Sequence, residues 1–334
     1  MRFNSLRFGK AISAALFVLL LVVVGSKNAL AQIQVATLQH GDDVSAFYGQ
    51  NAFVEAHSAA QTGDIITLSS GTFVPTTITK AITLRGAGCA IDTVANTNPT
   101  IFGGSIHLNV PDTINFLTVE GILFTHTVNH LTLYNPKFNR CNFAFIGGYS
   151  STTMHNAQFV NCIIDEFNLA NAFGTTFINS VMWRPAYPHN DILVYNSIIK
   201  CWDYQALSAY NTIIIRDDIY GVSSACTFIN CLGIAIEYQV FDDAYTSSCV
   251  TYNSYEDVFE SFNGSFSFEE PFNLKDEIAT GFLGSDGTQV GIYGGFMPYS
   301  NRPTYMVLKR CNVANKSTID GKLSVDIEVV TEEE

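Results

Sequence analysis

The chain of 334 residues carries 17 Lys and Arg against 30 Asp and Glu, a formal net charge of −13 at pH 7. An acidic surface repels phosphate backbones, so the composition argues against nucleic-acid binding, and against polyanionic substrates unless a basic cluster or a bound cation intervenes. Only 14% of the residues are charged and 13% are aromatic, which indicates much buried or stacked ring surface and few surface ion pairs.

The first 31 residues have the three parts of a secretory signal peptide. Basic residues precede an unbroken apolar run over 14–24, and Ala29-Leu30-Ala31 matches an A-x-A cleavage site. The alternative is a membrane anchor, but the run is shorter than the roughly 20 residues that a spanning helix needs. We therefore predict a signal peptide over 1–31 and no transmembrane span after cleavage. The mature chain would be secreted, or located at the cell surface or in the periplasm of a Gram-negative bacterium.

Residues 50–60 predict a short amphipathic helix. One face of this helix would carry Ala52, Phe53, Ala56, Ala59 and Ala60. A Gly-Asp turn ends the pattern, and alternating apolar residues then open short strands. A helix at this point would cap a β-structure whose core and strand edges would otherwise be exposed.

A half-polar hexapeptide recurs through the middle of the chain. It reads FVNCII at 159–164 and returns as FINSVM, VYNSII, AYNTII and FINCLG. Aligned on the residue after the Asn, the copies extend over Ile122, Cys141, Cys162, Ser180, Ser197, Thr212, Cys231 and Ser254. Short alternating segments at this period are typical of a β-solenoid. We predict a single all-β domain over 32–300, a parallel β-helix with strands stacked about 4.8 Å apart.

The repeated polar residues have a structural interpretation. Asn161, Asn179, Asn196, Asn211 and Asn230 precede the aligned slot, with Asn253 one coil later. Amides on stacked coils can hydrogen-bond to one another, so we predict an Asn ladder that stabilises a tight turn. Cysteines that share the slot predict a stack of small buried thiols rather than a disulfide framework. A disulfide stays open for Cys226, Cys231 and Cys249.

Three segments resemble the pectin-lyase-like right-handed parallel β-helix superfamily. They are AFVEAHSAAQTGDIITLSSGTF with ITKAITLRGAG, then FLTVEGILFTH, and finally GSDGTQVGIYGG at 284–295. These are similar to a cap helix with its first coil, an internal coil and a closing motif. Together with the KSTIDGKLSVDIEV tail, they resemble uncharacterised secreted proteins of Bacteroidetes. The resemblance implies a right-handed helix, but this superfamily contains lyases, hydrolases, esterases and non-enzymatic adhesins.

Resemblance to the hydrolase branch would imply NTD, DD, GHG and RIK motifs on successive coils. The chain has DD pairs at 42–43, 217–218 and 242–243 but no NTD, GHG or RIK. We interpret these pairs as solvated turns. The seven histidines form no H-x-H or H-E-x-x-H motif, so we predict no metal site.

One group of side chains just past the aligned slot could carry chemistry. Coil stacking would bring its members to one corner at about 5 Å per coil. Aromatic rings beside carboxylates and bases suit sugar binding, and the ligand-binding candidates are Trp183, Arg184, Tyr187, Trp202 and Tyr204.

A pectate-lyase-like reaction at this corner would need a base and carboxylates that hold Ca²⁺. Lys200 or Arg216 would be the base, and the metal ligands would be Asp165, Asp203 or Asp217. Ca²⁺ is expected only under this lyase alternative, and otherwise no cofactor is expected. The structural alternative is a ridge of alternating salt bridges with Trp packed underneath, because stacked like charges repel.

Residues 301–334 differ from the repeats. Val307 and Leu308, then alternating Leu323, Val325 and Ile327, predict a C-terminal strand segment that packs on the last coil and ends in an acidic tail. An attachment or secretion segment is the alternative.

These patterns favour an exported, monomeric, non-catalytic protein that binds glycans or cell-surface partners. The alternatives are a polysaccharide lyase or glycoside hydrolase acting on an acidic polysaccharide, and a purely structural envelope protein.

Overall fold

A computed structural model describes residues 34–300, except 93–96, 169–171, 187–190, 201–205, 217–224, 237–238 and 242–243, together with strands 307–313 and 325–330. The predicted signal peptide lies outside the described residues. The description below concerns the unit Gln34–Glu334 alone.

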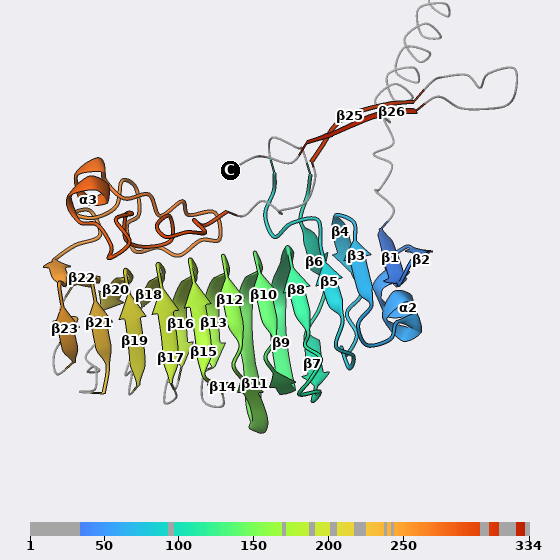
Figure 1. Ribbon diagram of the computed structural model, residues 1–334, viewed down its shortest axis with the longest axis horizontal. Helices are drawn as coiled ribbons and strands as arrows, with labels where there is room; N and C mark the ends of the chain where they lie inside the picture. Colours follow the sequence, from blue (N-terminus) through green and yellow to red (C-terminus); the bar gives the residue numbers. More distant parts are fainter. Residues whose placement is uncertain are drawn as a thin grey trace, which may run out of the picture. The chain divides into compact units, whose positions relative to one another are not determined.

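The fold is a parallel β-solenoid, as the repeat predicts (Figure 1). Sheet A contains, in spatial order, β2 (Asp43–Tyr48), β1 (Val35–His40), β3 (Ile65–Leu68), β5 (Thr83–Arg85), β8 (Thr118–Glu120), β10 (Lys137–Asn139), β12 (Gln158–Val160), β15 (Thr175–Ile178), β17 (Ile192–Tyr195), β19 (Leu207–Tyr210), β21 (Thr227–Ile229) and β23 (Tyr245–Ser247). Sheet B contains β24 (Val250–Tyr252), β22 (Leu232–Ala235), β20 (Ile213–Arg216), β18 (Ile198–Lys200), β16 (Val181–Ala186), β13 (Ile163–Asn168), β11 (Asn142–His155), β9 (Ile122–Tyr134), β6 (Thr100–Phe102) and β4 (Gly71–Phe73). In addition, β14 (Ala172–Phe173) pairs with β11, and β7 (Ile106–Val110) pairs with β9.

The core between the sheets is built from columns of identical or similar side chains. Phe138, Phe159 and Phe177 are register partners on successive coils of sheet A and are fully buried. Their rings stack with centroids 4.9 and 5.1 Å apart. This spacing is the distance between neighbouring strands, so each coil places its ring directly over the previous one.

The repeated Asn makes the corner between the two sheets. Asn161, Asn179, Asn196, Asn211 and Asn230 all adopt left-handed backbone conformations, with φ between 46° and 53°. Asn tolerates this region better than most residues because its short side chain can hydrogen-bond locally. The sequence therefore identified the turn residue correctly.

The predicted Asn ladder is wrong for this row. Among its five described members no amide bonds to another; instead, Nδ2 of Asn179 donates to the carbonyls of Ile292 and Gly294 at 2.8 and 2.7 Å. Oδ1 of Asn211 accepts from the backbone N–H of Ser285 at 2.9 Å. The amides of Asn179 and Asn211 bind a distant segment, because its backbone passes alongside these corners.

The ladder lies one residue later, in the Ser/Thr slot. The backbone N–H groups of Cys162, Ser180 and Ser197 each donate to the hydroxyl of the next coil, at 3.0, 3.1 and 3.3 Å. The register also corrects the last repeat: Leu232 pairs with Val250, so Cys249 occupies the slot rather than Ser254. Ser248, with φ of 56°, takes the place of the Asn.

Three cysteines of the slot are buried thiols, as predicted. Cys141, Cys162 and Cys231 are fully buried in the core, and the described cysteines are free. Each sulfur lies within hydrogen-bonding distance of backbone carbonyls of the turn. The small apolar thiol and the small hydroxyl thus occupy the same space in different coils.

The outer face of sheet B is covered by the chain that follows β24. Outward residues Ile163, Val181, Ile198, Ile213 and Leu232 form a second core with buried residues of the covering segment, Tyr255, Val258, Phe259, Phe262, Phe272, Leu274, Ile278, Val290 and Ile292. Figure 1 shows this segment and its helix α3 (Asp276–Gly281) beside strands of sheet B. The predicted range 32–300 therefore contains coils up to Tyr252 and a covering segment after it.

The N-terminal cap consists of helix α2 (Ala52–Ala59) and the antiparallel pair β1 and β2. Ala52, Phe53 and Ala56 are fully buried as predicted, whereas Ala59 is exposed and His57 is buried. Nζ of Lys80 donates to the carbonyl oxygen of His57 at 2.6 Å, which ties the helix to the first coil.

Near the C-terminus, β25 (Val307–Val313) and β26 (Val325–Val330) form an antiparallel pair, which confirms the predicted strands, while their packing on the last coil stays a prediction.

The contacts of Asn179 predict a measurable stability difference within the Asn row. Asn179→Ala should lower the free energy of unfolding by about 2–4 kcal/mol, because Ala is strained at positive φ and two carbonyls lose a donor. Asn161 has a similar φ, but its side-chain amide has no hydrogen-bond partner, so Asn161→Ala should show the strain alone. Urea denaturation measures both, and equal losses would contradict a role for the Asn179 amide.

Two buried histidines predict acid lability. Burial lowers the pKa of His57 to about 4, with Lys80 adding to the effect, and burial likewise lowers the pKa of His130 to about 4. Unfolded histidine titrates near 6.5, so below pH 6.5 the unfolded chain binds protons that the folded chain does not. Stability should fall between pH 6.5 and 4, by about 2 kcal/mol per histidine at pH 5.

Urea midpoints at pH 7 and pH 5 test this expectation. His57→Gln should reduce the difference between the two midpoints, whereas His126→Gln, at an exposed position, should leave it unchanged. An identical pH dependence in all three proteins would show that His57 does not contribute.

Candidate functional site

The predicted corner past the slot is partly assembled. Glu166 on β13 pairs in register with Arg184 on β16. Nε and Nη2 of Arg184 donate to the Asp165 carboxylate at 3.0 and 2.6 Å. Oε2 of Glu166 lies 3.7 Å from the same Nη2. The hydrogen bond to Asp165 raises the pKa of Arg184. Because the Arg184 side chain is 50% exposed, solvent screens this ion pair.

Trp183 lies underneath this corner and has little open surface. Trp183 is 6% exposed, because two rings pack on its indole. Phe262 contacts the indole edge-on, with ring centroids 5.4 Å apart, and Phe266 stacks on it, with centroids 5.7 Å apart. Nζ of Lys200 lies 5.0 Å from the centroid of the same ring. A sugar could reach the indole face only if the covering segment moved.

Arg216 is also enclosed. It is 2% exposed on β20, and its Nη1 donates to the carbonyl of Gln239. A guanidinium in this position has no route to a polysaccharide outside the helix. The other predicted site residues, Asp203, Asp217, Tyr187, Trp202 and Tyr204, lie outside the described residues.

The described half of the corner therefore has the geometry of the structural alternative, an ion-pair ridge with Trp packed below it. The assignments of a base and of metal ligands to these residues stay predictions. Within the described ranges, no three His, Cys, Asp or Glu side chains gather as a metal site would require. Neither described helix is long and apolar enough to cross a bilayer.

The outer face of sheet A has a different character. Alternation along the strands directs Thr176, Leu193 and Ser208 outward as register partners on β15, β17 and β19. The next outward row contains Tyr195 and Tyr210, whose rings stack with centroids 5.1 Å apart. These side chains are half-buried, so they present hydroxyl and apolar groups on a flat, hydrogen-bonded sheet.

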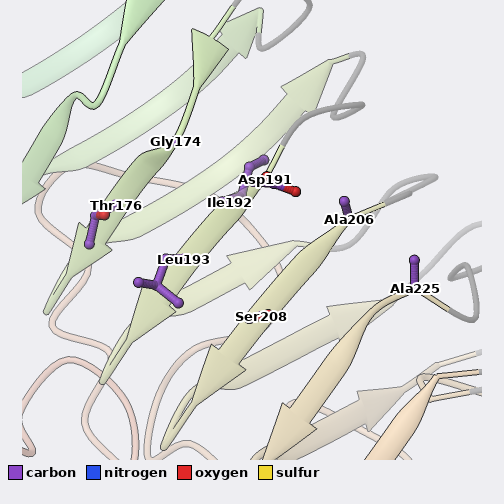
Figure 2. Close-up of a pocket in the computed structure, with 8 residues that line it drawn as sticks. All are labelled: Gly174, Thr176, Asp191, Ile192, Leu193, Ala206, Ser208 and Ala225. Atoms are coloured by element: carbon purple, nitrogen blue, oxygen red, sulfur yellow. The ribbon is translucent and has the colours of Figure 1, made fainter.

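A groove of about 290 Å³ lies on this face, which we call the sheet A groove. Figure 2 shows its lining from neighbouring strands: Gly174, Thr176, Asp191, Ile192, Leu193, Ala206, Ser208 and Ala225. Small residues stand at the beginnings of three coils, and their size leaves the hollow. Gly174 is required by its φ of 61°, and a Cβ there would come within 2.7 Å of Oδ1 of Asn156.

A partly exposed aromatic stack ends beside the groove. Tyr134, His155 and Phe173 stack on successive coils with centroids 5.1 and 5.2 Å apart. Phe173 is 39% exposed and directly precedes Gly174 of the lining. The groove thus combines one exposed carboxylate, two hydroxyls and an apolar side chain, with a partly exposed ring next to it in the chain.

The sequence pattern contained a signal for this site that composition and motif searches miss. Period-2 alternation before each Asn directs Thr176, Leu193 and Ser208 outward, and small residues precede β15, β19 and β21. Convergent polar groups beside apolar surface in a concave site are typical of ligand binding. The lining carries a single charged residue, Asp191, and no catalytic motif, so its residue types alone do not mark it as a site.

Mutation of Trp183 and mutation of Arg184 should change the free energy of unfolding by different amounts. Trp183→Ala removes a ring from the second core and should cost about 3–5 kcal/mol of unfolding free energy. Arg184→Ala removes a screened surface ion pair and should cost at most about 1 kcal/mol. Equal urea midpoints for wild type and Trp183→Ala would contradict the packing role of the indole.

Comparison of the chain with protein-family models, curated proteins and solved structures gave no match. The structure shows the parallel β-solenoid, and the resemblance to pectin-lyase-like proteins stays a prediction from the sequence motifs. A fold of this kind does not determine an activity, so function has to be argued from the groove.

Proposed function

We propose that this is an exported, non-catalytic β-helix protein of the pectin-lyase-like kind that binds a glycan in the sheet A groove. The observation that carries the proposal is the lining itself. Asp191, Thr176 and Ser208 can hydrogen-bond sugar hydroxyls, and Leu193 between them can contact the apolar face of a sugar ring.

The position of the lining on regular strands supports binding without rearrangement. Thr176, Leu193 and Ser208 alternate with Phe177, Val194 and Ala209, which are fully buried in the core below. Backbone pairing and core packing hold the three outward side chains about 4.8 Å apart along the helix axis. Side chains that are already held in place before binding lose less conformational entropy when the ligand binds.

Charge favours a neutral glycan over an acidic one. Asp191 is the charged member of the lining, and it is exposed. Without residues 1–31, the chain would have 13 basic and 30 acidic residues, so the long-range field also repels uronate polymers. A carboxylate is an effective acceptor for paired sugar hydroxyls, which a neutral glycan supplies.

Binding rather than cleavage agrees with the same lining. Glycoside hydrolysis uses a pair of carboxylates on either side of the scissile bond. The described lining contributes the single carboxylate of Asp191, and Asp165 at the corner is already bonded to Arg184. The sequence resemblance suggests a Bacteroidetes source, and the predicted signal peptide over 1–31 would place such a protein outside the cytoplasm.

A glycan array followed by calorimetry on a hit tests the proposal. Asp191→Ala should weaken binding about tenfold, because a charge-assisted hydrogen bond is lost. Ala206→Trp should abolish binding by filling the groove. Arg184→Ala, at the corner, is the matched control and should bind like wild type.

Two outcomes would overturn this proposal. Full binding by both groove variants, with loss in Arg184→Ala, would move the site to the corner. New unsaturated sugar ends that absorb in the near ultraviolet after incubation with hits would show that the protein is a lyase.

A further inference from the structure

Cys231 and Cys249 occupy the same slot on the last two coils. Leu232 pairs with Val250, so the two cysteines stand opposite each other immediately before β22 and β24. The backbone N–H of Val250 donates to the carbonyl of Cys231 at 3.1 Å, which fixes this register. Residues opposed on neighbouring parallel strands have Cα atoms about 4.8 Å apart, within the range that a disulfide spans.

Their side chains point the same way. Sγ of Cys231 lies 3.3 Å from the carbonyl oxygen of Ala209, and Sγ of Cys249 lies 3.4 Å from that of Phe228. Ala209 and Phe228 are themselves register partners on β19 and β21. The two sulfurs therefore repeat one position from coil to coil, stacked along the axis.

Exposure distinguishes this pair from the other stacked pair. Cys141 and Cys162 also stand opposite each other, but both are fully buried. Cys249 is partly exposed, whereas Cys231 is buried behind it. A hydrogen bond from the Cys231 thiol lowers the pKa of Cys249, whereas burial raises the pKa of Cys231, so Cys249 is the more readily ionised thiol of the pair.

We propose that Cys231 and Cys249 form a reversible disulfide that ties the last coil to the one before it. The oxidant would be a low-molecular-weight disulfide. The Cys249 thiolate attacks it, forming a mixed disulfide and releasing one thiolate. Cys231 then loses its proton and attacks Sγ of Cys249, which releases the second thiolate. The two protons from the cysteines end on the two small thiols, and the two cysteine sulfurs are oxidised as the reagent is reduced.

The position gives this bond a physical consequence. β23 and β24 belong to the last coil and lie at that end of the two sheets, so each has one neighbour within its sheet. In a solenoid a terminal coil is held by a single interface and opens most easily. A covalent link between coils would resist this opening, and it does not depend on the proposed glycan binding.

Oxidised glutathione applied to the folded full chain tests the proposal, with peptide mass spectrometry as the readout. Wild type should yield a peptide linked through Cys231 and Cys249, with Cys141 and Cys162 remaining reduced. Cys231→Ser should stop at a mixed disulfide on Cys249. Cys249→Ser should leave Cys231 unmodified. Serine is a natural occupant of this slot at Ser180 and Ser197, so both variants should fold.

The oxidised protein should also unfold at a higher temperature than the reduced protein, and the difference should vanish in Cys249→Ser. The proposal is overturned if oxidation links Cys249 to Cys226 or first consumes Cys141 and Cys162. It is also overturned if the folded wild type loses no thiols. An unchanged unfolding temperature after the correct bond has formed would remove the stabilising role.

Discussion

The sharp corner between the two sheets is the constraint on which the rest of the fold depends. Every coil must turn from sheet A to sheet B at the same point, and one residue in the left-handed backbone conformation makes this turn. Asn supplies that conformation in five coils, while Gly121, Arg140 and Ser248 supply it in others. Because the corner is fixed, the next residue occupies the same slot in each coil, and between Cys141 and Cys231 this slot is buried. Ser, Thr and Cys fit there, and the hydroxyls then link neighbouring coils through their backbone N–H groups.

Fixing the corner also determines which face of the solenoid stays open. From β13 to β22 the strand after the corner begins with residues that are apolar on both faces, so this part of sheet B needs a second cover, and the chain after β24 provides it. That cover uses the spare amides of Asn179 and Asn211 as anchoring points. It also buries Trp183, which removes the ring from the solvent. Sheet A alternates between inward and outward residues, which leaves its outer face available for a ligand.

The fold could be predicted because its information is local and repeated. One hexapeptide specifies a strand, a corner and a second strand, and its recurrence specifies the stacking. The cover could not be predicted in the same way, since the contact from Asn179 to Ile292 spans 113 residues of sequence. A local sign was present, however: runs such as Ile213-Ile214-Ile215 are continuously apolar, which is typical of strands buried on both faces. The predicted alignment of the last repeat on Ser254 was wrong, because Ser248 stands where the other coils have Asn.

The site was harder to predict than the fold because a site in a solenoid arises where repetition is broken. A regular coil presents a flat row of side chains, so a hollow forms only where side-chain size changes along a row. Gly174, Ala206 and Ala225 make that change at the edge of sheet A, and Asp191 places one charge at the same level. No single coil contains a recognisable motif, because each contributes only one or two members. The residues that line such a site therefore come from neighbouring coils and are separated in the sequence. They can be grouped only after the strand register is known.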